Sequence, residues 1–390
     1  MDFSDFIAPL DAEIFLERYF DREPLHVAAG GGETGRSALA STAAFLEWLE
    51  LVPQWQSGRL KMIMDSRPVG TEHYCVTREG AEGPVFRPDR ALVEAMMTLG
   101  ASAVADGVED ISSSIRQCCA MLGREFGAKS GANLYVSQAG VQAFASHCDP
   151  HEVFAIQCEG TKTWRIYANR ADTPVTATLL SDQSAIDRTK GPVMMEITMR
   201  PGDLLYIPRG FYHDAVASGG HSMHLTFAVQ PLYGLSAIEL MRELALESRV
   251  VRRYMPPADN PAALASHLEK LACEFSAILR SRALLEDIAV KQRIIASPIA
   301  NSSGANDRLL VRTGVPCQVF QPLDGSYFLV GRERVEAGLL TDVANWVFSQ
   351  TAFTPGQCLA RFCHHPEAEV RELLDALLRL NALQEHAVER

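Results

Sequence analysis

Hydrophobic and polar positions change their pattern twice along this chain, which divides it into three regions. In the first region, residues 11–20 predict a short helix that Pro24 ends, and residues 92–127 carry two helical patterns. From Ala132 onward the pattern is that of strands, because the apolar runs are short and are separated by Gly, Pro, Asp and Asn. These runs are "NLYVS", "EVFAIQ", "KTWRIY", "PVMMEITM", "DLLYIP" and "HLTFAV".

Short strands at close spacing with no helix between them predict an antiparallel sandwich or barrel. After Pro231 the pattern becomes helical again. The sequence "SAIE" at residues 236–239 predicts a capping box at the start of a helix. A second helix is predicted by a stripe of apolar residues at intervals of three and four. That stripe consists of Leu264, Leu268, Leu271, Phe275 and Leu279.

The last region begins after "NSSGAND", residues 301–307, which has the composition of a linker. It mixes helical patterns with a short strand pair in about 80 residues, an arrangement that resembles a winged helix. The whole sequence therefore predicts an α+β protein. A length of 390 residues agrees with the division into regions, because it corresponds to roughly two or three domains.

Composition narrows the class of protein. No apolar run reaches the roughly 18 residues of a membrane helix, and the acidic N-terminus differs from a signal peptide, so a cytoplasmic protein is expected. The nine cysteines are scattered and never spaced C-x-x-C, which disfavours disulfides and structural zinc. A net charge of −12 disfavours nucleic acid as a partner and suits a shielded anionic ligand or a basic protein.

The first candidate functional residues lie in the segment "SHCDPHEVF". His147 and Asp149 stand two positions apart, so on a strand both side chains project from the same face. Pro150 disfavours a helical conformation at Asp149, which excludes pairing of His147 with His151 on one helix face. His213, which opens a strand after "PGDLLYIPRGFY", is the candidate for a third ligand. Two histidines and one carboxylate form the ligand set of non-haem iron(II) oxygenases. The alternative for each histidine is a hydrogen-bonded polar residue at a strand end.

Lys162 is a further candidate functional residue. It follows Gly160 after a predicted tight turn, and it shares one strand face with Trp164 and Ile166. A lysine on an inward face needs an anionic partner. The carboxylate of a bound 2-oxoglutarate would be such a partner. The alternative is an exposed lysine on the outer face of the sheet.

Residues 132–167 and 201–227 together resemble the JmjC-type cupin oxygenases, in particular the ribosomal-protein hydroxylases of bacteria and their nucleolar relatives. The matching segments are "NLYVS", "HCD", "VFAIQCEGTKTW", "PGDLLYIPRGFYH" and "HSMHLTF". The resemblance implies a double-stranded β-helix (cupin or jelly-roll) catalytic domain over residues 1–235. It also implies a helical dimerisation domain over residues 236–300 and a winged-helix-like domain over residues 301–390.

The resemblance also implies roles for individual residues, with Fe(II) and 2-oxoglutarate as cofactors and O₂ as the co-substrate. Trp164 is expected in the core, His224 behind the site, and His151 beside the metal ligands or the substrate. The implied iron ligands are His147, Asp149 and His213, and the implied 2-oxoglutarate contacts are Lys162, Asn133, Tyr135 and Ser222.

The implied activity is hydroxylation of a protein side chain, with a ribosomal protein as the candidate substrate and a homodimer as the implied assembly. Three alternatives stay open: the same chemistry on a peptide natural product or small molecule, a hydrolytic or isomerase cupin with zinc or manganese, and a metabolite-sensing winged-helix regulator. Charge disfavours the regulator, since residues 301–390 hold 8 Arg and no Lys against 11 Asp and Glu, a net charge of 8 − 11 = −3.

Overall fold

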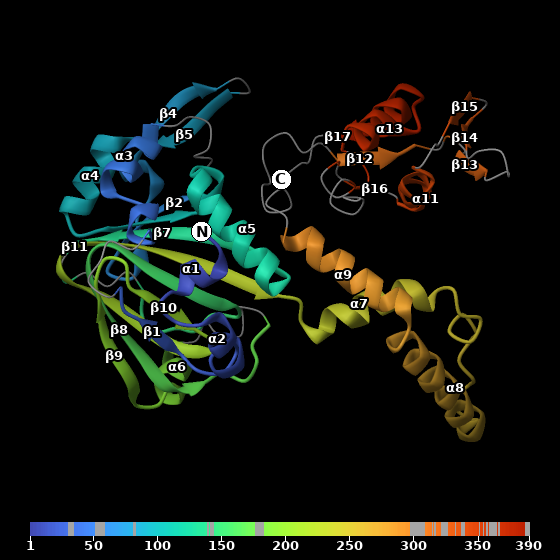
Figure 1. Ribbon diagram of the computed structural model, residues 1–390, viewed down its shortest axis with the longest axis horizontal. Coiled ribbons are helices and arrows are strands. Elements are labelled where there is room, and N and C mark those ends of the chain that lie inside the picture. Colours follow the sequence, from blue (N-terminus) through green and yellow to red (C-terminus); the bar gives the residue numbers. More distant parts are fainter. Residues whose placement is uncertain are drawn as a thin grey trace. The chain divides into compact units, whose positions relative to one another are not determined.

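The chain forms two compact units in the computed structural model, Met1–Pro231 and Leu232–Arg390 (Figure 1). Among the described residues, no helix combines the length and the apolar composition that a membrane span requires. The structure describes residues 1–29, 35–50, 59–80, 83–138, 140, 144–175, 183–296, 309–313, 315, 317–320, 327–331, 333–336, 340–350, 352–353, 355, 358, 365 and 367–386. The proposed linker at residues 301–307 lies outside these ranges.

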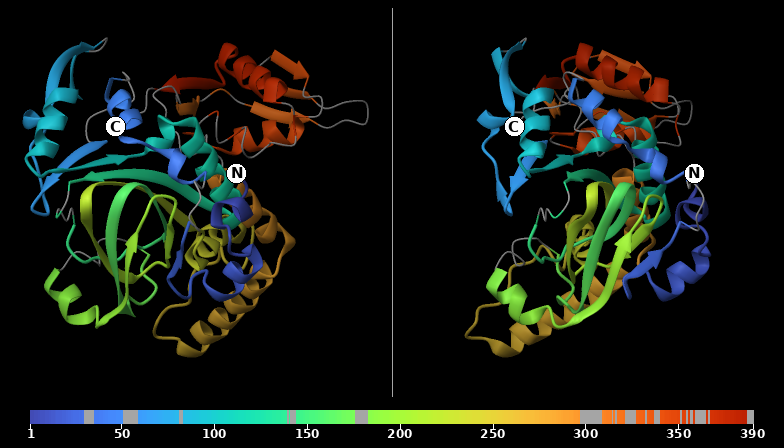
Figure 2. Two further views of the ribbon diagram at one scale, coloured as in Figure 1. Left: turned by 60° about the vertical axis from the view of Figure 1, so that its left-hand side comes forward. Right: turned by 90° about the vertical axis from the view of Figure 1, so that its left-hand side faces the viewer.

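A curled antiparallel sheet forms the centre of the first unit (Figure 2). Its strand order is β1-β10-β8-β11-β7-β6-β2-β3, and β9 pairs with β8. This confirms the predicted antiparallel, jelly-roll-like architecture. The strands are β1 (Leu25–Val27), β2 (Leu60–Met64), β3 (Arg67–Pro68), β6 (Ser102–Asp106), β7 (Ala128–Ser137), β8 (Glu152–Arg170), β9 (Val193–Met199), β10 (Leu204–Ile207) and β11 (Phe211–Pro231). A separate hairpin comprises β4 (Cys75–Gly80) and β5 (Gly83–Pro88).

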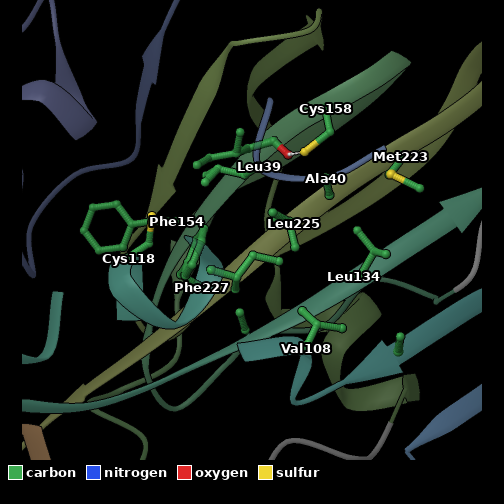
Figure 3. Close-up of a cluster of buried hydrophobic side chains, with 14 of the residues drawn as sticks. Leu39, Ala40, Val108, Cys118, Leu134, Phe154, Cys158, Met223, Leu225 and Phe227 are labelled. Carbon is green, nitrogen blue, oxygen red and sulfur yellow. Dashed lines mark hydrogen bonds between the residues drawn. The ribbon is translucent and has the colours of Figure 1, made fainter. Parts of the chain in front are cut away.

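Helices cover one face of this sheet. Alternate residues of the central strands, among them Phe154, Leu225, Phe227 and Leu134, enter one apolar cluster there (Figure 3). Phe6 packs edge-to-face against both Phe154 and Phe227, which anchors the first helix on the sheet. The helices of this unit are α1 (Phe3–Ile7), α2 (Ala12–Arg18), α3 (Thr42–Glu50), α4 (Arg90–Thr98), α5 (Ser113–Phe126) and α6 (Gln183–Thr189), with 3₁₀ turns η1 (Ser37–Leu39), η2 (Thr71–His73) and η3 (Val108–Asp110).

The helices predicted over residues 11–20 and 92–127 are present, and β6 and α6 are among the elements that the pattern did not predict. Helix α2 begins after Asp11, whose carboxylate accepts hydrogen bonds from the backbone N–H groups of Glu13 and Ile14. Strand β6 separates α4 from α5 within the region where only helices were predicted. The short helix α6 interrupts the run of strands between β8 and β9, so the expectation of strands without helices was wrong there.

The predicted tight turn at Gly160 was also wrong, because β8 continues through this residue. Gly160 has a φ of +62°, and the pairing of β8 with β11 shifts register around it. Such a bulge reverses which face each following residue points to. Val153 and Lys162 therefore line the same cavity although they are nine positions apart on β8.

The second unit begins with three helices, α7 (Gly234–Ala245), α8 (Pro261–Leu279) and α9 (Arg282–Ala296). Both predicted helices exist, but the capping box does not form, because Tyr233 is the N-cap and Ser236 lies inside α7. A separate apolar cluster contains residues of α11 (Thr341–Ser349) and α13 (Glu367–Arg379). Two three-stranded sheets accompany them, formed by β12 (Leu309–Arg312), β13 (Cys317–Phe320), β14 (Tyr327–Val330), β15 (Glu333–Glu336), β16 (Ala352–Phe353) and β17 (Leu383–His386).

Replacing Gly160 tests whether the stability of the protein depends on the bulge. A Cβ atom there would lie 1.8 Å from the backbone oxygen of His221, whereas at Gly220, which also has a positive φ, no atom lies within 4 Å of it. Gly220→Ala should lower the free energy of unfolding by about 1–2 kcal/mol through backbone strain alone. Gly160→Ala should lower it by about 2–5 kcal/mol, because backbone must also move. Urea unfolding of both variants measures this, and equal losses would contradict the structural role of the bulge.

Candidate active site

The face of the sheet opposite the helices lines a cavity of about 130 Å³. Residues of β7, β8 and β11 form its walls, together with the segment that precedes β8. The lining residues are Asn133, Tyr135, Phe144, His147, Asp149, His151, Val153, Lys162, Trp164, His213, Ala215, His224, Thr226 and Ala228. The cavity therefore contains every predicted site residue except Ser222.

His147, Asp149 and His213 converge in this cavity, with one potential ligand atom from each lying within 4.8 Å of the others. The segment that carries His147 and Asp149 is not the regular strand predicted from the sequence. It forms one isolated bridge, in which His147 N donates to His213 O at 3.0 Å and His213 N donates to His147 O at 2.8 Å. Gly210 N donates to Asp149 O at 2.8 Å. These three backbone bonds hold the segment against the start of β11.

Each histidine of the set is oriented by a hydrogen bond to the backbone carbonyl two residues before it. The Nδ1 atom of His147 lies 3.0 Å from Ala145 O, and the Nδ1 atom of His213 lies 3.0 Å from Phe211 O. A carbonyl oxygen only accepts, so Nδ1 carries the proton in each ring. The Nε2 lone pairs are then available to a metal, as in metal-binding histidines whose other nitrogen donates to a carbonyl.

The charges of the set also suit a cation. Burial, followed by the neighbouring His147, lowers the pKa of His213 to about 4, so its imidazole is neutral at neutral pH. Burial would raise the pKa of Asp149, but His147, His151 and His213 outweigh this effect, and the pKa is lowered. The neutral imidazole of His213 and the ionised carboxylate of Asp149 are in the protonation states that metal binding needs.

Asp214 is a structural support of the site that the sequence analysis did not identify. It is buried, and Oδ2 of its carboxylate accepts hydrogen bonds from Ser146 Oγ at 2.7 Å and from Tyr167 OH at 2.6 Å. Arg165 Nε donates to Oδ1 at 2.8 Å. Because Ser146 precedes His147 and Asp214 follows His213, this network ties the two ligand-bearing segments together. The sequence signal was a carboxylate adjacent to a ligand on an otherwise apolar strand.

Lys162 points into the cavity, and the inward face shared with Trp164 and Ile166 is confirmed by the burial of all three side chains. Its side chain is 3% exposed, and among the described residues it forms no ion pair. Burial lowers the pKa of Lys162 to about 7. An anionic occupant would restore the charge of this ammonium group, because opposite charges stabilise each other in a poorly solvated site.

The remaining predicted residues divide into two groups. Asn133 and Tyr135 line the cavity from β7, and the Tyr135 ring stacks on His224 with centroids 4.7 Å apart. Ser222 lies outside the lining and accepts a hydrogen bond from Gln157 Nε2 at 2.9 Å instead. It adjoins the register shift between Ala217 and Ser222 on β11. Trp164, expected only in the core, belongs to an apolar cluster and also lines the cavity.

A curled antiparallel sheet with a His/Asp/His set in its cavity defines a cupin-type barrel with a candidate metal site. Residues 110–235, which include this set and Lys162, match the JmjC domain family. The chain is 33% identical to Ribosomal oxygenase 1 of Homo sapiens over 226 residues, which cover 57% of this chain and 33% of that protein. It is 31% identical to Ribosomal oxygenase 1 of Rattus norvegicus over 262 residues, or 65% of this chain and 42% of that protein.

Residues 110–235 therefore form a JmjC domain, and the chain is similar to the ribosomal oxygenases. The matched region spans less than half the length of these curated relatives. Among solved structures, Escherichia coli ycfD matches with a TM-score of 0.48 and 18% identity, covering 97% of this chain and 99% of that chain.

The geometry predicts how metal binding depends on single side chains. His147→Ala and Asp149→Ala should each weaken binding of Fe(II) or Co(II) by about 100-fold or more, because each removes a direct ligand. His151→Ala is the matched control, since His151 lines the same cavity without belonging to the ligand set. Titration with Co(II), followed by its visible absorption, measures the affinity. Parent-like affinity in both ligand variants would refute the ligand assignment.

Proposed function

We propose that this protein is an Fe(II)- and 2-oxoglutarate-dependent oxygenase that hydroxylates a protein side chain. The observation that supports this best is the presence in one cavity of a His/Asp/His set and of a buried lysine without an ion-pair partner among the described residues. A hydrolytic zinc or manganese site has no need of the lysine, whereas a bound dicarboxylic acid needs both features.

The donor set fits Fe(II), which two imidazoles and one carboxylate bind while leaving open positions. His147, Asp149 and His213 would hold the ion through two Nε2 atoms and a carboxylate oxygen. When bound, Fe(II) and 2-oxoglutarate supply the oxidising chemistry: O₂ is consumed, one oxygen atom enters a substrate C–H bond, and 2-oxoglutarate becomes succinate and CO₂. The protein contributes binding, orientation and exclusion of water.

Lys162 would pair with the distal carboxylate of 2-oxoglutarate. Asn133 and Tyr135 would complete that side of the cavity. Burial, followed by the charges of Asp149 and Asp106, raises the pKa of Tyr135, so its hydroxyl keeps its proton and can donate to an anion. Asn133 is held from behind, because its Oδ1 accepts a hydrogen bond from Gly107 N at 3.2 Å. Ser222 is not among the proposed cofactor contacts, because it lies outside the cavity lining.

A ribosomal protein is the proposed substrate. The similarity to proteins named ribosomal oxygenases supports this class, and a net charge of −12 favours a basic protein over nucleic acid. A relative from Dictyostelium discoideum, 29% identical over 221 residues that cover 56% of this chain and 41% of that protein, is named as both a lysine-specific demethylase and a histidyl-hydroxylase. N-demethylation releases formaldehyde and hydroxylation does not, so the two outcomes are separable.

The test is turnover on ribosomal proteins. Protein loaded with Fe(II) should convert 2-oxoglutarate to succinate in the presence of one ribosomal protein or its peptide, and the substrate should gain the mass of one oxygen atom without formaldehyde. Lys162→Ala should abolish turnover at ordinary 2-oxoglutarate concentrations and retain Co(II) binding, because it removes only the ion pair. Lys129→Ala, an exposed lysine on β7, is the matched control. Release of formaldehyde would favour demethylation, and no succinate with any ribosomal protein would contradict the proposed substrate class.

We also propose a three-part organisation, with a catalytic region at residues 1–235, a helical dimerisation region at 236–300 and a winged-helix-like region at 301–390. Within α8, Leu268 is 50% exposed and Leu279 is 54% exposed in the single chain. A partner subunit that covered this apolar stripe would form a two-fold, isologous interface. The winged-helix-like region would serve as a protein-contact module, because its net charge of −3 disfavours a role in binding DNA.

The proposed dimer predicts a change in molar mass. Replacing Leu268 and Phe275 with glutamate should yield monomers, since two charges would be buried without partners in an apolar interface. Leu99→Glu, at a residue in the first unit that is 68% exposed, should leave the molar mass unchanged. Light scattering at micromolar protein distinguishes the states. A monomeric parent would refute the dimer, and a dimeric double variant would place the interface elsewhere.

A further inference from the structure

The short helix α6 shares an apolar cluster with the segment that carries His147 and Asp149. Cys148, which lies between these two residues, is buried in that cluster, and α6 contributes Ile186. The buried residues of the cluster, none of which belongs to the cavity lining, are Cys148, Tyr167, Ile186 and Tyr212. Helix α6 therefore supports the ligand-bearing segment through residues outside the cavity wall.

Lys190, which directly follows α6, adds a polar contact with the same segment. Its Nζ atom donates to Ser146 Oγ at 3.0 Å and to Asp187 Oδ1 at 2.9 Å. The Nζ atom also lies 4.6 Å from the centroid of the Tyr167 ring, a distance at which an ammonium group and an aromatic ring attract each other. Asn169 N on β8 donates to Lys190 O at 3.1 Å. Lys190 is thus anchored to β8, while its ammonium group reaches the residue that precedes His147.

The hydrogen bonds around Ser146 can run in only one direction. An ammonium group only donates, so Ser146 Oγ accepts the bond from Lys190. A carboxylate only accepts, so the hydroxyl proton of Ser146 goes to Asp214 Oδ2 at 2.7 Å. Both Ser146 and Asp214 are buried, and water therefore competes little for these bonds. Lys190 and Asp214 together fix the Ser146 hydroxyl between the chain before His147 and the chain after His213.

We propose that Lys190 is a positioning residue for the metal site. By holding Ser146 on Asp214, it fixes the backbone before His147 relative to the backbone after His213, and it does so from outside the cavity lining. This inference rests on the metal-binding part of the proposed function. A metal binds tightly when its ligands are held near their coordination geometry in advance, and groups that support the ligands from outside therefore change the metal affinity.

One alternative is that α6 and Lys190 only cover the apolar cluster and contribute to folding stability. Lys190→Met would then lower the free energy of unfolding and leave metal binding unchanged. A second alternative is that Lys190 acts only through its ion pair with Asp187, whose side chain is 53% exposed and whose ion pair is therefore worth little. Asp187→Asn removes that ion pair and keeps the bond from Lys190 to Ser146, so it is the matched control.

Titration of the full chain with Co(II), followed by visible absorption, reports both affinity and coordination geometry without turnover. Lys190→Met should raise the dissociation constant for Co(II) by about 3–10-fold and change the absorption of the bound ion, because the ligands lose an outer support. Asp187→Asn should match the parent in both measurements. Ser146→Ala should weaken Co(II) binding by about tenfold. Adding Lys190→Met to Ser146→Ala should cause no further loss, because Lys190 acts through Ser146 and the two changes are then not additive.

The outcomes separate this inference from the proposed function. Parental affinity and absorption in Lys190→Met, an equal loss in Asp187→Asn, or a further loss in the double variant would each overturn the positioning role. A parent that binds no Co(II) would overturn the metal site and this inference with it, whereas a parent that binds Co(II) but does not turn over 2-oxoglutarate would overturn the proposed function alone. Circular dichroism establishes that each variant is folded. If Lys190→Met does not fold, Ser146→Ala decides, and parental Co(II) affinity in that variant would overturn the inference.

Discussion

The site depends on one constraint in the backbone, the register shift where β8 and β11 pass Gly160. In a regular strand without the bulge, residues nine positions apart would point to opposite faces of the sheet. The bulge lets Val153 and Lys162 on β8, and Ala215 and His224 on β11, line the same cavity although each pair is nine positions apart. Only glycine fits, because a Cβ at position 160 would meet the His221 carbonyl at 1.8 Å. The bulge is therefore the reason that Lys162 lines the same cavity as His147, Asp149 and His213.

Electrostatics explain why the cavity needs an occupant. Burial removes water from the charged groups of the site, and the packing around them supplies little compensation. The pKa of Lys162 falls to about 7 and that of His213 to about 4, because each positive charge is poorly solvated. The same conditions strengthen any interaction with a bound cation or anion. The proposed 2-oxoglutarate would supply an anionic partner for Lys162, which forms no ion pair within the described part of the chain.

Support from outside the cavity keeps the ligands in place. The segment with His147 and Asp149 belongs to no strand, and only a few backbone bonds hold it to β11. The buried carboxylate of Asp214 adds side-chain bonds across the same junction, through Ser146, Tyr167 and Arg165. A site assembled from separate segments in this way is positioned by hydrogen bonds of defined geometry, which apolar packing alone does not provide.

The sequence by itself determined the antiparallel strands, the choice of His147, Asp149 and His213 as candidate ligands, and the strand face that Lys162 shares with Trp164, because alternation and residue chemistry are local properties. Tertiary structure decided the rest. The face that follows Gly160 depends on pairing with β11, and the bridge at His147 depends on a residue 66 positions away, 213 − 147 = 66. Ser222 lies outside the cavity lining and Trp164 lies within it. The bulge between β8 and β11 sets which face of each strand a residue occupies, and no alternating pattern in the sequence records that bulge.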